Sequence, residues 1–171
     1  NLEVNDFKIY QDGMVADAEV GQKIVEEGVK SGSKNYEIID DLLKKGAVLV
    51  KTEDFALVKE ERDRIVKITQ AATTTQKLIA YLKYKLAKNR LLKKRDNYIA
   101  KRIDETLDYG ETGILFLGAY HDMIPKLAKD IQVIEVKEAR KISRYQNLLL
   151  SARKNKLEFE ELNKYLISPA T

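Results

Sequence analysis

The 171-residue chain has no cysteine and only one histidine. The absence of cysteine excludes disulfides and thiolate metal sites. One histidine is also too few for the usual zinc sites, which combine several histidine and cysteine ligands. No apolar run approaches the roughly 20 residues that a bilayer-spanning helix needs, so no membrane span is expected. No signal peptide is visible, and the cytoplasm is the default location.

Several common catalytic motifs are missing as well. The glycines at 110, 113 and 118 do not have dinucleotide-binding spacing, and residues 31–34 do not form a phosphate loop. No serine stands in a nucleophile elbow. The composition, with 44% hydrophobic and 34% charged residues and a net charge of +4, is ordinary for a globular protein with a mild basic excess.

Hydrophobic periodicity predicts an α/β fold. We expect one domain over 1–167, built from a small, mostly parallel sheet of about four strands flanked by long helices, with a frayed tail at 168–171. The predicted strands are 7–10, 47–51, 113–117 and 131–136. The predicted helices are 18–30, 34–45, two or three within 55–108 with a break near 73–75, and 137–165.

Polar residues follow three of the predicted strands. Asp12 follows the first strand, Glu53 the second, and His121 and Asp122 follow the third, which reads as buried on both faces. The carboxyl ends of parallel strands share one edge of a sheet, where α/β proteins bind ligands. Carboxylates and an imidazole there suit acid–base chemistry or a hard metal ion. The alternative is that these acids only form turns and cap helices.

Two apolar stripes occur in the long helical region. One contains leucines at 78, 82 and 86, and the other contains Leu91, Arg95, Ile99 and Ile103. A charge within an apolar stripe must be paired or line a cleft, unless its stem packs and its guanidinium reaches water.

The segment 77–102 is strongly basic, with ten Lys and Arg against one acid, Asp96, and with interleaved tyrosines. This pattern suits a phosphate backbone and stacked bases. It predicts a nucleic-acid or acidic partner bound through four cations: Lys83, Lys88, Arg90 and Lys94. The alternative is a solvated basic face, which is common on long helices.

The motif Gly118-Ala119-Tyr120-His121 has the form Gly-x-x-His after an apolar strand, and 94–103 carries an arginine followed by an apolar pair and isoleucine. These motifs resemble the carboxyl half of the TraB/Tiki-type Gly-x-x-His superfamily, whose relatives include TraB/GumN, ChaN-like and erythromycin-esterase-like proteins. The resemblance covers about 47–137. It implies that His121, Glu53 and Arg95 line a cleft that in some members supports metal-dependent hydrolysis.

One family feature is missing, because the first strand does not end in Gly-x-x-His. A metal would then rest on Asp12, Glu53 and His121, a set better suited to Mn²⁺ or Mg²⁺ than to zinc. Either the chain is a divergent or non-catalytic member, or an upstream segment carries the missing motif.

The leading hypothesis is therefore a TraB-like protein of unassigned activity, with a cleft around His121 that binds a small molecule or peptide, or hydrolyses an amide or ester. Its catalytic residues would be His121 as ligand or base, Glu53 as base or ligand, and Arg95 as an oxyanion or carboxylate clamp. Asp12, Asp122 and Gly118 are candidate ligand-binding residues, and a divalent metal is possible. The alternatives are a non-enzymatic binding module using 77–102 and an interaction domain whose long helices self-associate. The oligomeric state stays open.

Overall fold

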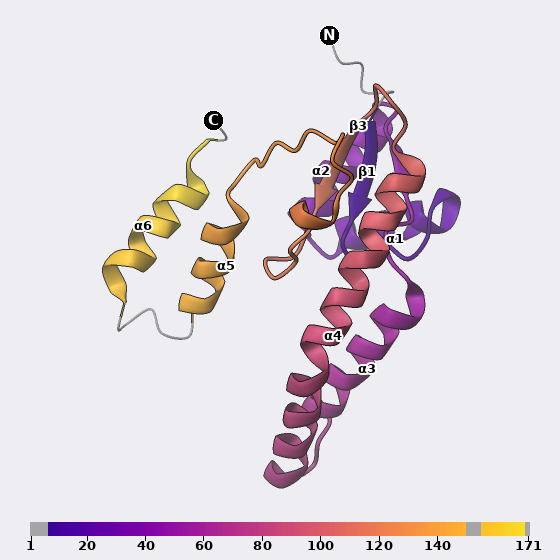
Figure 1. Ribbon diagram of the computed structural model, residues 1–171. Helices are drawn as coiled ribbons and strands as arrows, with labels where there is room; N and C mark the ends of the chain where they lie inside the picture. The colour runs from indigo at the N-terminus through magenta and orange to yellow at the C-terminus, as the bar shows by residue number, and fades with distance from the viewer. Residues whose placement is uncertain (1–6, 150–154, 170–171) are drawn as a thin grey trace.

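A computed structural model describes residues 7–149 and 155–169 (Figure 1). Its sheet has three strands, β1 (Phe7–Gln11), β2 (Val48–Val50) and β3 (Thr112–Phe116). The strand order is β2-β1-β3, and both pairings are parallel. The described part of the chain is thus α/β with a small parallel sheet, as the sequence pattern predicts.

Helices cover both faces of the sheet. Helices α1 (Ala18–Lys30) and α2 (Lys34–Lys44) pack against the face that carries Ile9 and Leu49. The next residues along β1 and β2, Tyr10 and Val50, point to the opposite face and pack against α4. This alternation follows from the two-residue period of a strand, and it divides the core into two clusters.

Helices α3 (Phe55–Thr69) and α4 (Thr74–Thr106) form an antiparallel pair that extends from the sheet as an arm (Figure 1). Thr73 caps α4 by accepting a hydrogen bond from the backbone N–H of Gln76 at 3.2 Å. The expected break near 73–75 is therefore confirmed. The side chain of Asp54 caps α3 by accepting a hydrogen bond from the backbone N–H of Leu57, and the nearby Thr52 is buried.

The two apolar stripes of α4 differ in burial. Leu91, Ile99 and Ile103 are buried against the sheet and α3, and Arg95 is buried with them. The leucines at 78, 82 and 86 are exposed, because they lie on the outward face of the arm. Sequence periodicity identifies an apolar face, but it does not show whether the fold provides something to cover that face.

The fourth strand predicted at 131–136 is wrong. That segment has no regular secondary structure, and Ile134 and Val136 are exposed. The alternation of apolar residues satisfies the strand pattern, but a strand also needs a ladder partner, and no described residue pairs with this segment. β3 is therefore an edge strand, and its residues are half-buried or exposed rather than buried on both faces.

The single helix predicted over 137–165 is also wrong. The structure has two helices there, α5 (Ala139–Leu148) and α6 (Lys156–Ile167), and residues 150–154 lie outside the described residues. The rings of Tyr145 and Phe159 stack with centroids 5.0 Å apart, which requires the chain to reverse between them. The tail expected to fray begins with Ser168 and Pro169, whose carbonyls accept hydrogen bonds from Lys137, and 170–171 lie outside the described residues.

Within the described ranges, no helix combines the length and apolar content that a membrane-spanning segment requires. α4 has 33 residues, but Lys and Arg recur along it.

Candidate functional site

The carboxyl ends of the three strands converge at one edge of the sheet. Asp12 directly follows β1, and its backbone N–H donates to the carbonyl of Phe116 at the end of β3, at 2.9 Å. The backbone N–H groups of Thr52 and Glu53, after β2, both donate to the carbonyl of Met14, at 2.9 Å. Because β2 and β3 lie on opposite sides of β1, this edge is the topological switch point of the sheet, where open α/β folds bind ligands.

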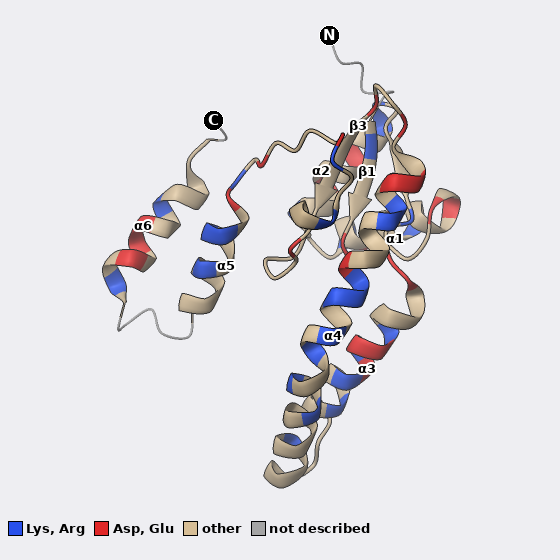
Figure 2. Cartoon of the chain, in the orientation of Figure 1, with Lys and Arg blue, Asp and Glu red and all other residues tan. Residues whose placement is uncertain are grey.

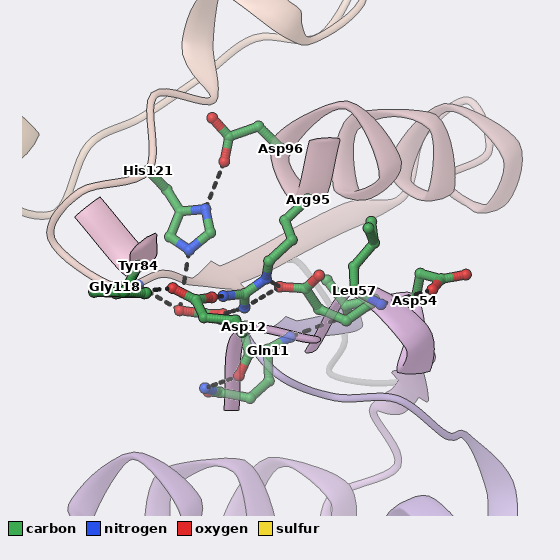
Figure 3. A network of polar contacts seen from close by, with 12 residues as sticks. Gln11, Asp12, Asp54, Leu57, Tyr84, Arg95, Asp96, Gly118 and His121 are labelled. Atoms are coloured by element: carbon green, nitrogen blue, oxygen red, sulfur yellow. Dashed lines mark hydrogen bonds and ion pairs between the residues drawn. The ribbon is translucent and has the colours of Figure 1, made fainter. Parts of the chain in front are cut away.

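The Arg95 guanidinium lies at the centre of an ion-pair network (Figure 3). Its Nε and Nη2 donate to Oε1 of Glu53, at 3.0 and 2.5 Å. Its Nη1 donates to Glu61 on α3 at 2.5 Å, and its Nη2 also donates to Oδ1 of Asp12. Arg95 and Glu53 are both buried, so the guanidinium is paired with carboxylates as its place in an apolar stripe requires.

His121 lies between two carboxylates. Its Nδ1 is 2.6 Å from Oδ1 of Asp96, and its Nε2 is 3.2 Å from Oδ2 of Asp12 (Figure 3). The backbone N–H of Gly118 also donates to Oδ2 of Asp12, at 3.1 Å. The Gly-x-x-His segment therefore holds Asp12 at both ends, through a backbone amide and an imidazole.

Burial and these contacts shift the ionisation of the cluster. Burial opposes the charge on Asp12, but the hydrogen bond and charge of His121, with the charge of Arg95, lower the pKa of this carboxyl to about 2. Burial raises the pKa of Glu53, and the guanidinium only partly offsets it. Burial opposes the charge on His121 as well, yet the hydrogen bonds and charges of Asp12 and Asp96 raise the pKa of its imidazole.

The cluster has more carboxylates than cations. Four acids, at 12, 53, 61 and 96, surround one guanidinium and one imidazole. Oε1 of Glu53 accepts hydrogen bonds from Arg95, while Oε2 is buried without a hydrogen-bond partner. Asp12, Glu53 and His121 each offer one ligand atom, and these atoms lie within 4.8 Å of one another. A buried unpartnered carboxylate oxygen in an acid-rich cluster fits a bound cation.

The structure brings together most of the residues that the sequence singles out. Asp12, Glu53, Arg95, Gly118 and His121 all belong to the network. Asp122 does not, because it is exposed on the loop beyond His121 and is not among the partners in the network's ion pairs.

Sequence reasoning missed Glu61 and Asp96. Asp96 is the one acid in a ten-cation segment and directly follows Arg95, which is a signal that could have marked it. Glu61 lies among other charged residues of α3, so nothing in the sequence separates it from them.

The four cations proposed for nucleic acid lie along α4. Lys83, Arg90 and Lys94 are exposed, and Arg90 is 3.6 Å from Glu60. Lys88 lies over the ring of Tyr120, 4.1 Å from its centroid. Nucleic-acid binding stays a prediction.

The chain matches no known family model, no curated protein and no solved structure.

Proposed function

We propose that the cluster at the strand ends is a hydrolytic centre that acts on an amide or ester with the help of a divalent cation. One observation carries the proposal: Asp12, Glu53 and His121 converge within 4.8 Å, and one oxygen of Glu53 is buried without a partner. The resemblance of the Gly-x-x-His segment to the TraB/Tiki-type superfamily supports the same reaction class.

The residues present fit a divalent cation. Two carboxylates and one imidazole form a ligand set that suits Mn²⁺ or Mg²⁺. An imidazole binds metal in its neutral form, and Asp96 accepts from Nδ1, so Nε2, which faces Oδ2 of Asp12 at 3.2 Å, is the ring nitrogen that would bind the ion. A bound ion would polarise a substrate carbonyl and lower the pKa of its bound water. The surplus of acids in the cluster supplies the negative charge that such an ion requires.

Glu53 is suited to bind the ion. Arg95 holds its Oε1 through two nitrogens, so the direction of the carboxyl group is fixed and Oε2 is the oxygen left to face the cation. Burial raises the pKa of this carboxyl, and a bound cation would favour its charged form.

Arg95 is suited to hold carboxylates rather than to stabilise an oxyanion. All three of its nitrogens donate to acids, namely Glu53, Glu61 and Asp12. A guanidinium in these contacts positions two of the reactive carboxylates and compensates part of their charge. Arg95 would therefore clamp the protein's own carboxylates rather than an oxyanion of the substrate.

Calorimetric titration of the purified, chelator-treated chain with Mn²⁺ tests the metal part of the proposal. We expect one ion per chain, with affinity lowered about tenfold or more in Glu53→Gln. Asp122→Asn is the matched control, because Asp122 lies next to His121 but outside the network, and it should bind as the unaltered chain does. Absence of binding up to millimolar Mn²⁺ would contradict the proposal.

Hydrolysis of p-nitrophenyl acetate and of a fluorogenic peptide, with Mn²⁺ and with EDTA, tests the reaction class. We expect turnover with Mn²⁺, its loss in EDTA, and its loss in Glu53→Gln but not in Asp122→Asn. Mn²⁺ binding without turnover of either substrate class would leave a metal-binding site and reject hydrolysis of these bonds.

A further inference from the structure

In the arm formed by α3 and α4, helix α4 has two apolar faces, an inner one that packs toward α3 and an outward one. Ala87 and Leu91 are buried along α4, and Ala80 and Tyr84 line a groove shared with α3. Leu82 follows Ala80 by two residues, a rotation of about 200° along an α-helix, so it lies on the opposite side of α4.

This outward face contains three leucines in an i, i+4, i+8 row. Leu78, Leu82 and Leu86 are 56%, 49% and 85% exposed. Ile79 and Tyr81, beside them, are exposed too. An isolated exposed leucine is ordinary, but a row of three with two large apolar neighbours forms a contiguous patch that indicates a binding surface.

Cations flank this row on both sides. Residues 77–94 contain seven Lys and Arg and no acid, and Figure 2 shows basic residues recurring along α4. On the 100° spacing of a helix, Lys85 lies to one side of the leucines and Arg90 and Lys83 lie to the other, while Lys93 continues the row toward the end of the basic stretch. The acids of α3 are largely paired within the arm, as in Lys59–Asp63 and Arg64–Glu60.

The charge pattern decides between possible occupants. A second copy of the same face would place its cations against those of the first, so self-pairing through this face is disfavoured. Nucleic acid would use the cations but leave the leucines in water, because phosphate contacts need no apolar partner. An anionic bilayer satisfies both, since leucines enter the acyl boundary while lysines extend to the headgroups.

We propose that the outward face of α4, with Leu78, Leu82 and Leu86 flanked by lysines, docks on the surface of an anionic lipid bilayer. The helix lies along the membrane surface and does not cross it. Affinity arises from the buried leucine area together with attraction between the cations and acidic headgroups.

Co-sedimentation of the full chain with lipid vesicles tests this docking. We expect binding to phosphatidylcholine vesicles that contain phosphatidylserine and little binding to phosphatidylcholine alone. The double variant Leu82→Ser/Leu86→Ser should bind at least about tenfold more weakly. The double variant Lys83→Gln/Lys85→Gln should lose about fivefold for each lysine.

A matched control replaces two exposed apolar side chains of another helix. Leu157→Ser/Ile167→Ser changes two exposed apolar residues of α6 and should bind as the unaltered chain does. Circular dichroism confirms that each variant keeps its helices. The proposal would be overturned by no binding to the acidic vesicles or by equal vesicle binding of the leucine variant. If, with equal vesicle binding, both chains also bound double-stranded DNA at physiological salt, nucleic acid would replace the bilayer as the partner of this face.

Discussion

Oδ1 of Asp96 lies 2.6 Å from Nδ1 of His121, and both side chains are almost completely buried. A carboxylate accepts hydrogen bonds and cannot donate them, so Nδ1 of the imidazole carries the proton in this contact. The opposite ring nitrogen then faces Asp12. Asp96 therefore determines which nitrogen of the chain's one histidine faces the cluster of candidate ligands.

Asp96→Asn should weaken metal binding more than it weakens the fold. The amide keeps the size of the side chain but holds the imidazole through a weaker, neutral hydrogen bond. Loss of such an orienting carboxylate typically lowers metal affinity about 10- to 100-fold. Titration with Mn²⁺ measures this change, and Asp104→Asn, an exposed acid on the same helix, is the control. Equal affinity in both variants would show that Asp96 does not orient His121 for a ligand.

Arg95→Met should strongly destabilise the protein. The substitution leaves Asp12, Glu53 and Glu61 without their shared cation, and removing one partner of a buried ion pair costs about 3–5 kcal/mol in the free energy of unfolding. Urea denaturation measures it. Lys101→Met, on the exposed side of α4, should change that free energy by less than about 1 kcal/mol.

A second substitution separates lost charge compensation from lost packing. Arg95→Met/Glu53→Gln removes the most deeply buried uncompensated acid, so the double variant should be more stable than Arg95→Met alone. A double variant less stable than the single one would contradict the electrostatic explanation.

Gly118→Ala should disturb the cluster directly. A Cβ at this position would lie 2.9 Å from Oδ2 of Asp12 and 3.6 Å from Cδ2 of His121. Asp12 cannot easily move away, because Arg95, His121 and the Gly118 amide all hold its carboxylate. Crowding of this kind costs about 1–3 kcal/mol, measurable in urea. A fully stable variant with unchanged Mn²⁺ affinity would show that this close approach is not required.

The sequence predicted the positions of the polar cluster because strand ends obey simple topology. Asp12, Glu53 and His121 each follow a short apolar run, and parallel strands bring their carboxyl ends to one edge. Arg95 was identifiable because a charge at apolar spacing demands partners. Glu61 was not, since a helix period does not show which of several charged residues faces a buried cation, and Asp96 could be marked only as the one acid of a basic segment, not as a partner of His121.

The remaining errors arose from tertiary context. The run 131–136 alternates as a strand does, but alternation says nothing about a ladder partner, and the structure leaves the segment unpaired. The leucines at 78, 82 and 86 have the spacing of a core stripe, yet the arm projects from the sheet and leaves them exposed (Figure 1). In both cases the local sequence pattern is that of a buried element, but the tertiary structure leaves most of its apolar side chains exposed.

Tyr10→Phe should change how stability depends on alkaline pH. Tyr10 is buried, its hydroxyl is 2.9 Å from Oγ1 of Thr106, and burial raises the pKa of its phenol. Above about pH 10 the unfolded chain loses this proton before the folded protein does, so stability falls as pH rises through that range. Urea denaturation between pH 8 and pH 11 should show a shallower fall in Tyr10→Phe than in the unaltered chain.

The exposed Tyr109 provides the control, because its environment is nearly the same in the folded and unfolded chain. Tyr109→Phe should keep the pH dependence of the unaltered protein. If Tyr10→Phe keeps it too, the buried phenol is not the group responsible.

Anomalous diffraction from crystals grown with saturating Mn²⁺ would show directly whether an ion binds at the strand ends. We expect one strong anomalous peak among the side chains of Asp12, Glu53 and His121, with Asp96 still accepting from Nδ1 of the imidazole. A well-ordered cluster with no anomalous peak among these three residues would contradict a metal site there.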